Sequence, residues 1–149
     1  MKRKMILVVT AITAIPIGGW ALHKNGSKKP SPRGASSEQP SQAGVPPYYA
    51  ILNGVTVPKT LPPQQFSNPL AREGYEIAAK IPKVLTQMPC YCHCDVMGHK
   101  SLLDCFTGKH AAYCNICLDS ASFVYQRWKT GERIATIRQQ LIEKNRQKN

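Results

Sequence analysis

Acidic residues are scarce in this chain of 149 residues, which has 8 Asp and Glu against 20 Lys and Arg and a formal net charge of +12. Such an excess of basic residues suggests a nucleic-acid or anionic-membrane partner, so its distribution along the chain matters. Residues 1–68 contain one acid and eight basic residues, residues 69–126 contain five of each, and residues 127–149 contain two acids and seven basic residues. The excess therefore flanks a neutral middle, and we expect no nucleic-acid partner.

Several patterns are also missing. After residue 68 there is no long alternation of apolar and polar residues, so a β-sheet is not expected there. The residue after Cys117 is Leu118, where attachment of a c-type haem requires His. Apart from a Cys/His pair, no nucleophile and base stand in a recognisable arrangement, so we do not expect an enzyme.

Residues 1–22 have the pattern of a signal anchor or a signal peptide. A basic start at Lys2–Lys4 precedes an apolar run from Met5 to Leu22, and its length of about 18 residues lies between a long signal-peptide core and a short membrane span. Small residues permit cleavage after Ala21, whereas the lysines that follow the run favour an uncleaved anchor. The pattern predicts a single N-terminal membrane helix with the remainder of the chain outside the cytoplasm, periplasmic or at the cell surface.

Residues 23–60 read as a Pro/Ser-rich tether, because residues 23–68 hold eight of the 12 Pro residues and too few apolar groups to offset the entropy of ordering. Within this stretch, Tyr48–Leu52 and Val55–Val57 flank an Asn-Gly pair, a pattern that fits either a small hairpin or a disordered linker. Leu61–Phe66 is expected to lie extended along the surface of the following domain.

Residues 61–149 predict a mainly α, small cysteine-rich helical domain of three to four helices. Asn68 is a good N-cap and Pro69 suits the first helical position. A helical period of apolar residues follows, with a break at Pro82. The members of this period are Leu70, Ile77, Ile81 and Leu85.

Three further helices are expected after the break. Gly98–Phe106 predicts a short helix, and the stretch from His110 to Lys129 predicts one long helix with an apolar stripe. That stripe consists of His110, Cys114, Cys117, Ala121, Val124 and Trp128. The last helix begins near Glu132 and carries a basic face, which we interpret as solvated.

The cysteines carry the predicted chemistry. Cys90, Cys92 and Cys94 alternate, so an extended backbone would place their sulfurs on one face. Thiolates that close together repel one another unless a cation neutralises them, which is the situation in a soft-metal site. The candidate metal ligands are Cys90, Cys92, Cys94, Cys105, Cys114, Cys117, His110, His93 and His99. This donor set suits copper, as Cu(I), or zinc.

Disulfide bonds are the alternative use of six cysteines outside the cytoplasm. A bond between Cys90 and Cys92, or between Cys92 and Cys94, would close a strained ring. The three could instead pair with Cys105, Cys114 and Cys117, so a disulfide-stapled scaffold remains open beside the metal site. An iron–sulfur cluster is possible by ligand count but is less expected outside the cytoplasm.

A family resemblance rests on these same residues. Met88–Asp95 reads Met-Pro-Cys-Tyr-Cys-His-Cys-Asp, and it is followed by Gly98–Leu102, Cys105-Phe106, His110–Ala112 and Cys114–Cys117. This order resembles that of the PCYCGC-motif family of exported bacterial proteins and lipoproteins, whose activity is unassigned. In two respects the chain departs from the family pattern: His93 stands where the motif has Gly, and no lipobox Cys follows the apolar run.

Two functions follow as expectations. The first is a membrane-tethered extracytoplasmic binding protein that holds a soft metal ion and exchanges it with a metal donor or acceptor. The second is a disulfide-stapled helical scaffold that binds another protein of the cell envelope, without metal.

Overall fold

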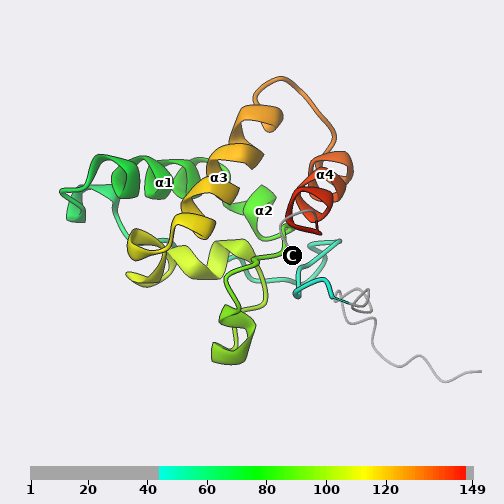
Figure 1. Ribbon diagram of the computed structural model, residues 1–149, viewed down its shortest axis with the longest axis horizontal. Helices are drawn as coiled ribbons and strands as arrows, with labels where there is room; N and C mark the ends of the chain where they lie inside the picture. Colours follow the sequence, from blue (N-terminus) through cyan, green and yellow to red (C-terminus); the bar gives the residue numbers. More distant parts are fainter. Residues whose placement is uncertain (1–43, 147–149) are drawn as a thin grey trace, which may run out of the picture. The chain divides into compact units, whose positions relative to one another are not determined.

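The computed structural model describes residues 44–146, which form a small helical domain (Figure 1). Its α-helices are α1 (Pro69–Lys80), α2 (Pro82–Leu85), α3 (Asn115–Trp128) and α4 (Ile134–Arg146). No β-strand forms within this range, so the expectation of a mainly α domain is confirmed. The apolar segment predicted as a membrane helix lies outside the described residues, and none of the helices within them is long and apolar enough to cross a membrane.

The first helix begins and ends as the sequence predicts. The Asn68 side chain accepts hydrogen bonds from the backbone N–H groups of Leu70 and Ala71, and Pro69 occupies the first position. The chain breaks at Ile81, and the following proline opens the single turn of α2. Of the predicted apolar period, Ile77, Ile81 and Leu85 are buried as expected, whereas Leu70 is 65% exposed. The buried side of α1 also includes Ala71, Gly74, Tyr75 and Ala78.

A stack of aromatic rings fixes the segment before α1. Phe66 stacks on Tyr75 with ring centroids 4.0 Å apart, and Tyr75 meets Phe106 edge-on at 5.1 Å. The Leu61 N–H donates to the Phe106 carbonyl at 3.0 Å. The stretch 61–66 therefore lies against the domain as expected, although Pro63–Gln65 forms one 3₁₀ turn within it.

The predicted hairpin before this segment is absent. Asn53 and Gly54 do form a turn, closed by a hydrogen bond from the Val55 N–H to the Leu52 carbonyl, but the flanking residues do not pair as strands. The chain instead runs to the domain, where the Tyr49 N–H donates to the Thr86 carbonyl. Nearby, Val45 and Tyr48 are buried with Ile142 of α4.

The predicted long helix from His110 is interrupted. His110–Tyr113 form a 3₁₀ turn, Cys114 is extended, and α3 begins only at Asn115. On one straight helix Ala111 and Cys117 would lie roughly 120° apart around the axis, yet both are fully buried. The bend at Cys114 lets both side chains enter the core. The prediction that the apolar stripe extends to Trp128 is also wrong, because this side chain is 36% exposed.

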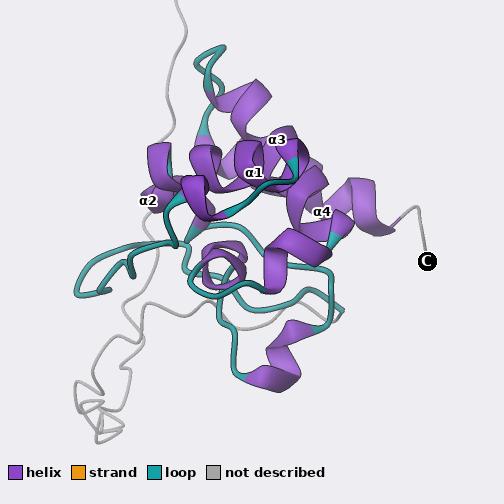
Figure 2. Cartoon of the chain, turned by 90° about the vertical axis from the view of Figure 1, so that its left-hand side faces the viewer, coloured by secondary structure: helices purple, strands orange, loops and turns teal. Residues whose placement is uncertain are grey.

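Helices and irregular chain occupy different parts of the domain. Figure 2 shows α1, α2, α3 and α4 gathered together, while loops and short turns fill the remainder. Between Leu85 and Asn115 the chain contains no α-helix, only 3₁₀ turns at Cys94–Met97, Leu102–Phe106 and His110–Tyr113. The predicted helix at Gly98–Phe106 is thus a shorter and tighter turn. Most of the cysteines lie in this irregular stretch.

Candidate metal centre

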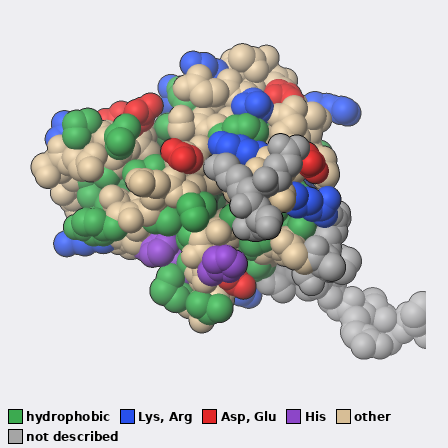
Figure 3. Space-filling view, viewed as in Figure 1, with side chains coloured by type: hydrophobic (Ala, Val, Ile, Leu, Met, Phe, Trp, Pro, Cys, Tyr) green, Lys and Arg blue, Asp and Glu red, His purple; other side chains and the backbone are tan. Residues whose placement is uncertain are grey.

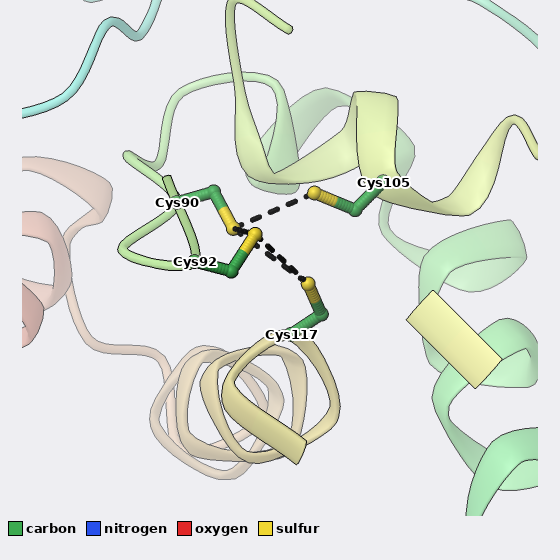
Figure 4. A group of neighbouring side chains, drawn as sticks. All are labelled: Cys90, Cys92, Cys105 and Cys117. Carbon is green, nitrogen blue, oxygen red and sulfur yellow. Dashed lines mark hydrogen bonds between the residues drawn. The ribbon is translucent and has the colours of Figure 1, made fainter. Parts of the chain in front are cut away.

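Four cysteines from three separate parts of the chain meet at one point (Figure 4). Cys90 and Cys92 come from the loop after α2, Cys105 from a 3₁₀ turn, and Cys117 from the first turn of α3. Their sulfur atoms all lie within 4.8 Å of one another. The Cys90 Sγ lies 3.1 Å from Cys92, 3.4 Å from Cys105 and 3.7 Å from Cys117.

Backbone contacts hold these segments in place. The Leu102 N–H donates to the Met88 carbonyl at 2.8 Å, which ties the cysteine loop to the turn that carries Cys105. The neighbour of Cys105 in sequence, Phe106, is fully buried against Tyr75 of α1. The Tyr75 hydroxyl in turn donates to the Gly108 carbonyl at 2.5 Å. The sulfurs are therefore presented by segments that the hydrophobic core positions.

Two more groups of ligand atoms overlap the first one. Cys94 and His110 join Cys92 and Cys105 in the second group. In the third group, Cys114 and His110 join Cys92 and Cys117. The His110 Nε2 lies 3.4 Å from the Cys92 Sγ. All six cysteines and His110 therefore belong to one continuous cluster.

The two remaining candidate histidines lie differently. His99 approaches the cluster, with Nδ1 3.5 Å from the Cys105 Sγ and its ring edge-on to that of His110. His93 is exposed and belongs to none of the three groups. Its backbone has φ +58°, in the left-handed region. The structure thus brings His99 to the cluster and leaves His93 outside it.

The conformation of His93 explains the glycine of the resembling motif. A left-handed backbone costs an L-residue about 1–2 kcal/mol, and Gly adopts it freely. The turn at His93 separates Cys92 from Cys94, so the geometry of the sulfurs depends on it. The Gly of the motif is best understood as a requirement for a left-handed backbone at this position. His is among the non-Gly residues that adopt this conformation more often than most.

None of the six cysteines is disulfide-bonded. The shortest sulfur–sulfur contact, 3.1 Å between Cys90 and Cys92, is well above the bond length of about 2.05 Å. Four sulfurs are buried, whereas two are half-exposed. The arrangement is a cluster of free thiols whose sulfurs and imidazole nitrogens could hold a metal ion.

Hydrogen bonds among the thiols shift their acidities in opposite directions. Hydrogen bonds with Cys105 and Cys117 lower the pKa of Cys90 to about 2, because they stabilise its thiolate. Hydrogen bonds with Cys117 and Cys90, together with burial, raise the pKa of Cys105 far above its ordinary value. Burial also raises the pKa of Cys92 and of Cys94. The metal-free cluster thus favours a thiolate at Cys90 with protonated neighbours, and a metal ion would displace those protons.

The sequence identifies the ligand types but not how they are shared. Nothing in the spacing shows that Cys92 belongs to all three groups. The sequence also gives no signal for Ser101, whose buried hydroxyl has no hydrogen-bond partner. Ser101 lines a crevice with Cys90, Cys94 and His99 that is too narrow to hold a water molecule.

Comparison with known proteins agrees with the sequence resemblance. No curated protein and no solved structure matches the chain significantly. One family model, described as a protein of unknown function with PCYCGC motif, matches residues 54–148. This range covers more than half of the chain and includes every cysteine of the cluster. The chain therefore belongs to the PCYCGC-motif family.

Proposed function

We propose that the protein is a membrane-tethered, extracytoplasmic binding protein for a soft metal ion, Cu(I) or Zn(II). The observation that carries this proposal is the group of four sulfurs from Cys90, Cys92, Cys105 and Cys117, which converge without forming disulfides. Sulfur is the preferred donor for soft ions, and four thiolates form a common structural zinc set.

The spacing of the sulfurs suits such an ion. Zn–S bonds of about 2.3 Å in a tetrahedron set the sulfur–sulfur distances at about 3.8 Å. Four contacts in this group measure 3.1, 3.4, 3.5 and 3.7 Å. An ion would therefore need these four pairs of sulfurs to move apart by about 0.1–0.7 Å. Trigonal Cu(I) would use three of the sulfurs and require a similarly small adjustment.

The surface next to the cluster supports exchange with a partner. Val96 and Met97 follow Cys94, and Tyr113 and Ile116 flank Cys114 in sequence; all four are large hydrophobic residues with exposed fractions of 84%, 59%, 88% and 44%. Figure 3 shows histidines beside hydrophobic side chains on one face. Apolar surface around a metal site is suited to docking of another protein. We infer that a metal donor or acceptor of the envelope docks here.

The location outside the cytoplasm rests on the sequence. The basic start and the apolar run from Met5 to Leu22 are typical of a signal anchor. A Pro-rich tether would then hold the domain away from the membrane. Retention of the full chain in the membrane fraction after a high-salt wash is the expected result, since salt screens charge contacts but not an apolar helix.

Mass spectrometry of the full chain, purified from an oxidising compartment, tests the metal proposal. Native spectra and elemental analysis are expected to show bound copper or zinc that is lost on acidification, with six alkylatable thiols afterwards. Matched spectra of Cys92→Ser should show loss of metal, whereas those of His93→Gly should not. A metal-free protein in which each cysteine pair has lost two hydrogens would overturn the proposal.

A metal-free protein with paired cysteines would instead support the disulfide-stapled scaffold. The close approach of Cys94 and Cys105, 3.3 Å between buried sulfurs, is the contact that favours it. Under that alternative, replacement of Cys94 by Ser leaves one reactive thiol that alkylating reagents label. Under the metal proposal, the four ligands Cys90, Cys92, Cys105 and Cys117 become reactive only after the metal is removed.

A further inference from the structure

We propose that the cluster binds more than one Cu(I) ion, with Cys92 as a bridging thiolate, and that ions enter at its half-exposed edge formed by Cys114 and His110. This inference rests on the proposed function and extends it from a single site to a polynuclear one. It follows from how the three ligand groups overlap and from how their members are buried.

The three groups share sulfurs but not all of their ligands. Cys92 is common to all three, Cys105 belongs to two and Cys117 to two. Each of the remaining sulfurs, those of Cys90, Cys94 and Cys114, belongs to one group only. Thiolates, unlike imidazole nitrogens, have further lone pairs and can bridge two metal ions. The pattern of shared sulfurs with individual terminal sulfurs is that of a metal–thiolate cluster.

A single metal ion would leave part of the cluster without a bound ion. One four-coordinate ion takes four ligands and leaves other buried sulfurs beside it without a partner. If all six cysteines ionised around one divalent ion, four negative charges would remain in the cluster. Uncompensated charge in a buried site is strongly unfavourable. Several univalent ions neutralise the thiolates better, and Cu(I) needs only two or three ligands each.

Burial is graded across the cluster. Cys94, Cys105 and Cys117 are 1%, 0% and 0% exposed, whereas Cys92, Cys114 and His110 are half-buried. The group that contains Cys114 is therefore the most exposed of the three. It shares Cys92 and Cys117 with the buried four-sulfur group. An ion bound at the edge can thus pass inward by exchanging Cys114 and His110 for Cys90 and Cys105, without leaving Cys92.

Titration of the full chain in detergent tests the stoichiometry. The metal-free, fully reduced protein is titrated anaerobically with Cu(I) against a chromogenic chelator, and native mass spectra count the ions bound. More than one Cu(I) per chain is expected, with X-ray absorption showing copper neighbours around copper. Saturation at one ion per chain, or sulfur neighbours alone, would overturn the cluster while leaving the proposed metal binding intact. Binding of no ion would overturn both.

Variants separate the bridging ligand from the terminal ones. Cys92→Ser breaks all three groups and is expected to reduce the capacity to at most one ion. Cys94→Ser and Cys114→Ser each break one group and should lose at most one ion. His93→Gly lies next to Cys92 but outside the cluster, and it should retain the full capacity. Equal losses for Cys92→Ser and Cys94→Ser would refute the bridging role.

Transfer kinetics test the entry edge. Stopped-flow transfer of Cu(I) from the chelator should slow about tenfold or more in Cys114→Ser, while Cys94→Ser should take up its first ion at the rate of the unmodified protein. Circular dichroism confirms that each variant is folded before titration. Equal transfer rates in the two variants would refute entry at Cys114.

Discussion

Replacing Gly74 by Ala is expected to destabilise this domain, although the same change inside a helix ordinarily stabilises it. Gly74 lies in α1, where it packs against α3. An added Cβ would lie 2.4 Å from the Leu118 Cδ2 and 3.4 Å from the Phe106 Cε1. Ordinary contacts begin at 3.4 Å, so the Leu118 methyl group must retreat by about 1 Å.

Two opposing effects set the size of the change. Gly→Ala within a helix contributes about 1 kcal/mol of stability through backbone entropy. Overpacking at a tight contact costs about 1–3 kcal/mol. Because Leu118 is half-buried and its end can move, we take the middle of that range. The expected net loss is about 1 kcal/mol, which for a domain of this size lowers Tm by about 4–8 °C.

Urea unfolding followed by helical circular dichroism measures this loss on the reduced, metal-free protein. The same replacement is made in a Leu118→Ala background, where the clashing methyl group is gone. There, Gly74→Ala should stabilise by about 1 kcal/mol, so the sign of its effect reverses. Gly108→Ala, whose Cβ meets nothing within 4 Å, is the control. Stabilisation by Gly74→Ala in both backgrounds would refute the reasoning.

Three further outcomes are expected from urea unfolding of the metal-free protein. The free energy of unfolding should be largest near pH 8.5, the ordinary pKa of a thiol. As the pH decreases below 8.5 it should fall because the pKa of Cys90 is lowered, and as the pH increases above 8.5 it should fall because the pKa of Cys105 is raised. Cys90→Ala should remove most of the fall below pH 8.5, and Cys105→Ala should reduce the fall above it, where the raised pKa values of Cys92 and Cys94 also contribute. A flat profile in the unmodified protein would contradict both causes. Asn68→Ala, which removes the cap of α1, should cost about 1 kcal/mol, whereas Asn68→Asp should cost far less. His93→Gly should gain about 0.5–1 kcal/mol by relieving the left-handed residue; a loss would show that the His93 side chain contributes contacts.

The sequence predicts best where local chemistry decides. The cap at Asn68 and the break at Pro82 depend on groups within one turn, and the structure has both as expected. The alternation of cysteines correctly indicates that the sulfurs of Cys90 and Cys92 lie together. The extended backbone expected through Cys94 is wrong, because His93 is left-handed and Cys94 begins a 3₁₀ turn. Local signals of this kind do not depend on the remainder of the fold.

The errors arise where tertiary packing overrides periodicity. The predicted helix through Cys114 satisfies a regular spacing, but burial of Ala111 requires the chain to bend there. Leu70 fits the helical period yet is exposed, whereas Gly74, which no apolar pattern indicates, lies at the contact between α1 and α3. Neither contact partner can be identified from the helix's own sequence. The sharing of Cys92 among three groups is likewise a property of the assembled fold.

The irregular stretch between Leu85 and Asn115 has a consequence for the lifetime of the protein. With no α-helix of its own, it depends on a few backbone hydrogen bonds and on the core for its order, and segments of this kind are where proteases cut first. Ions that join its sulfurs to α3 would close these loops, and ligand binding at 100 times Kd contributes about 2.7 kcal/mol against opening. Where proteases are present, the amount of intact protein would then follow the supply of the ion, so that the turnover rate of the protein would depend on metal availability.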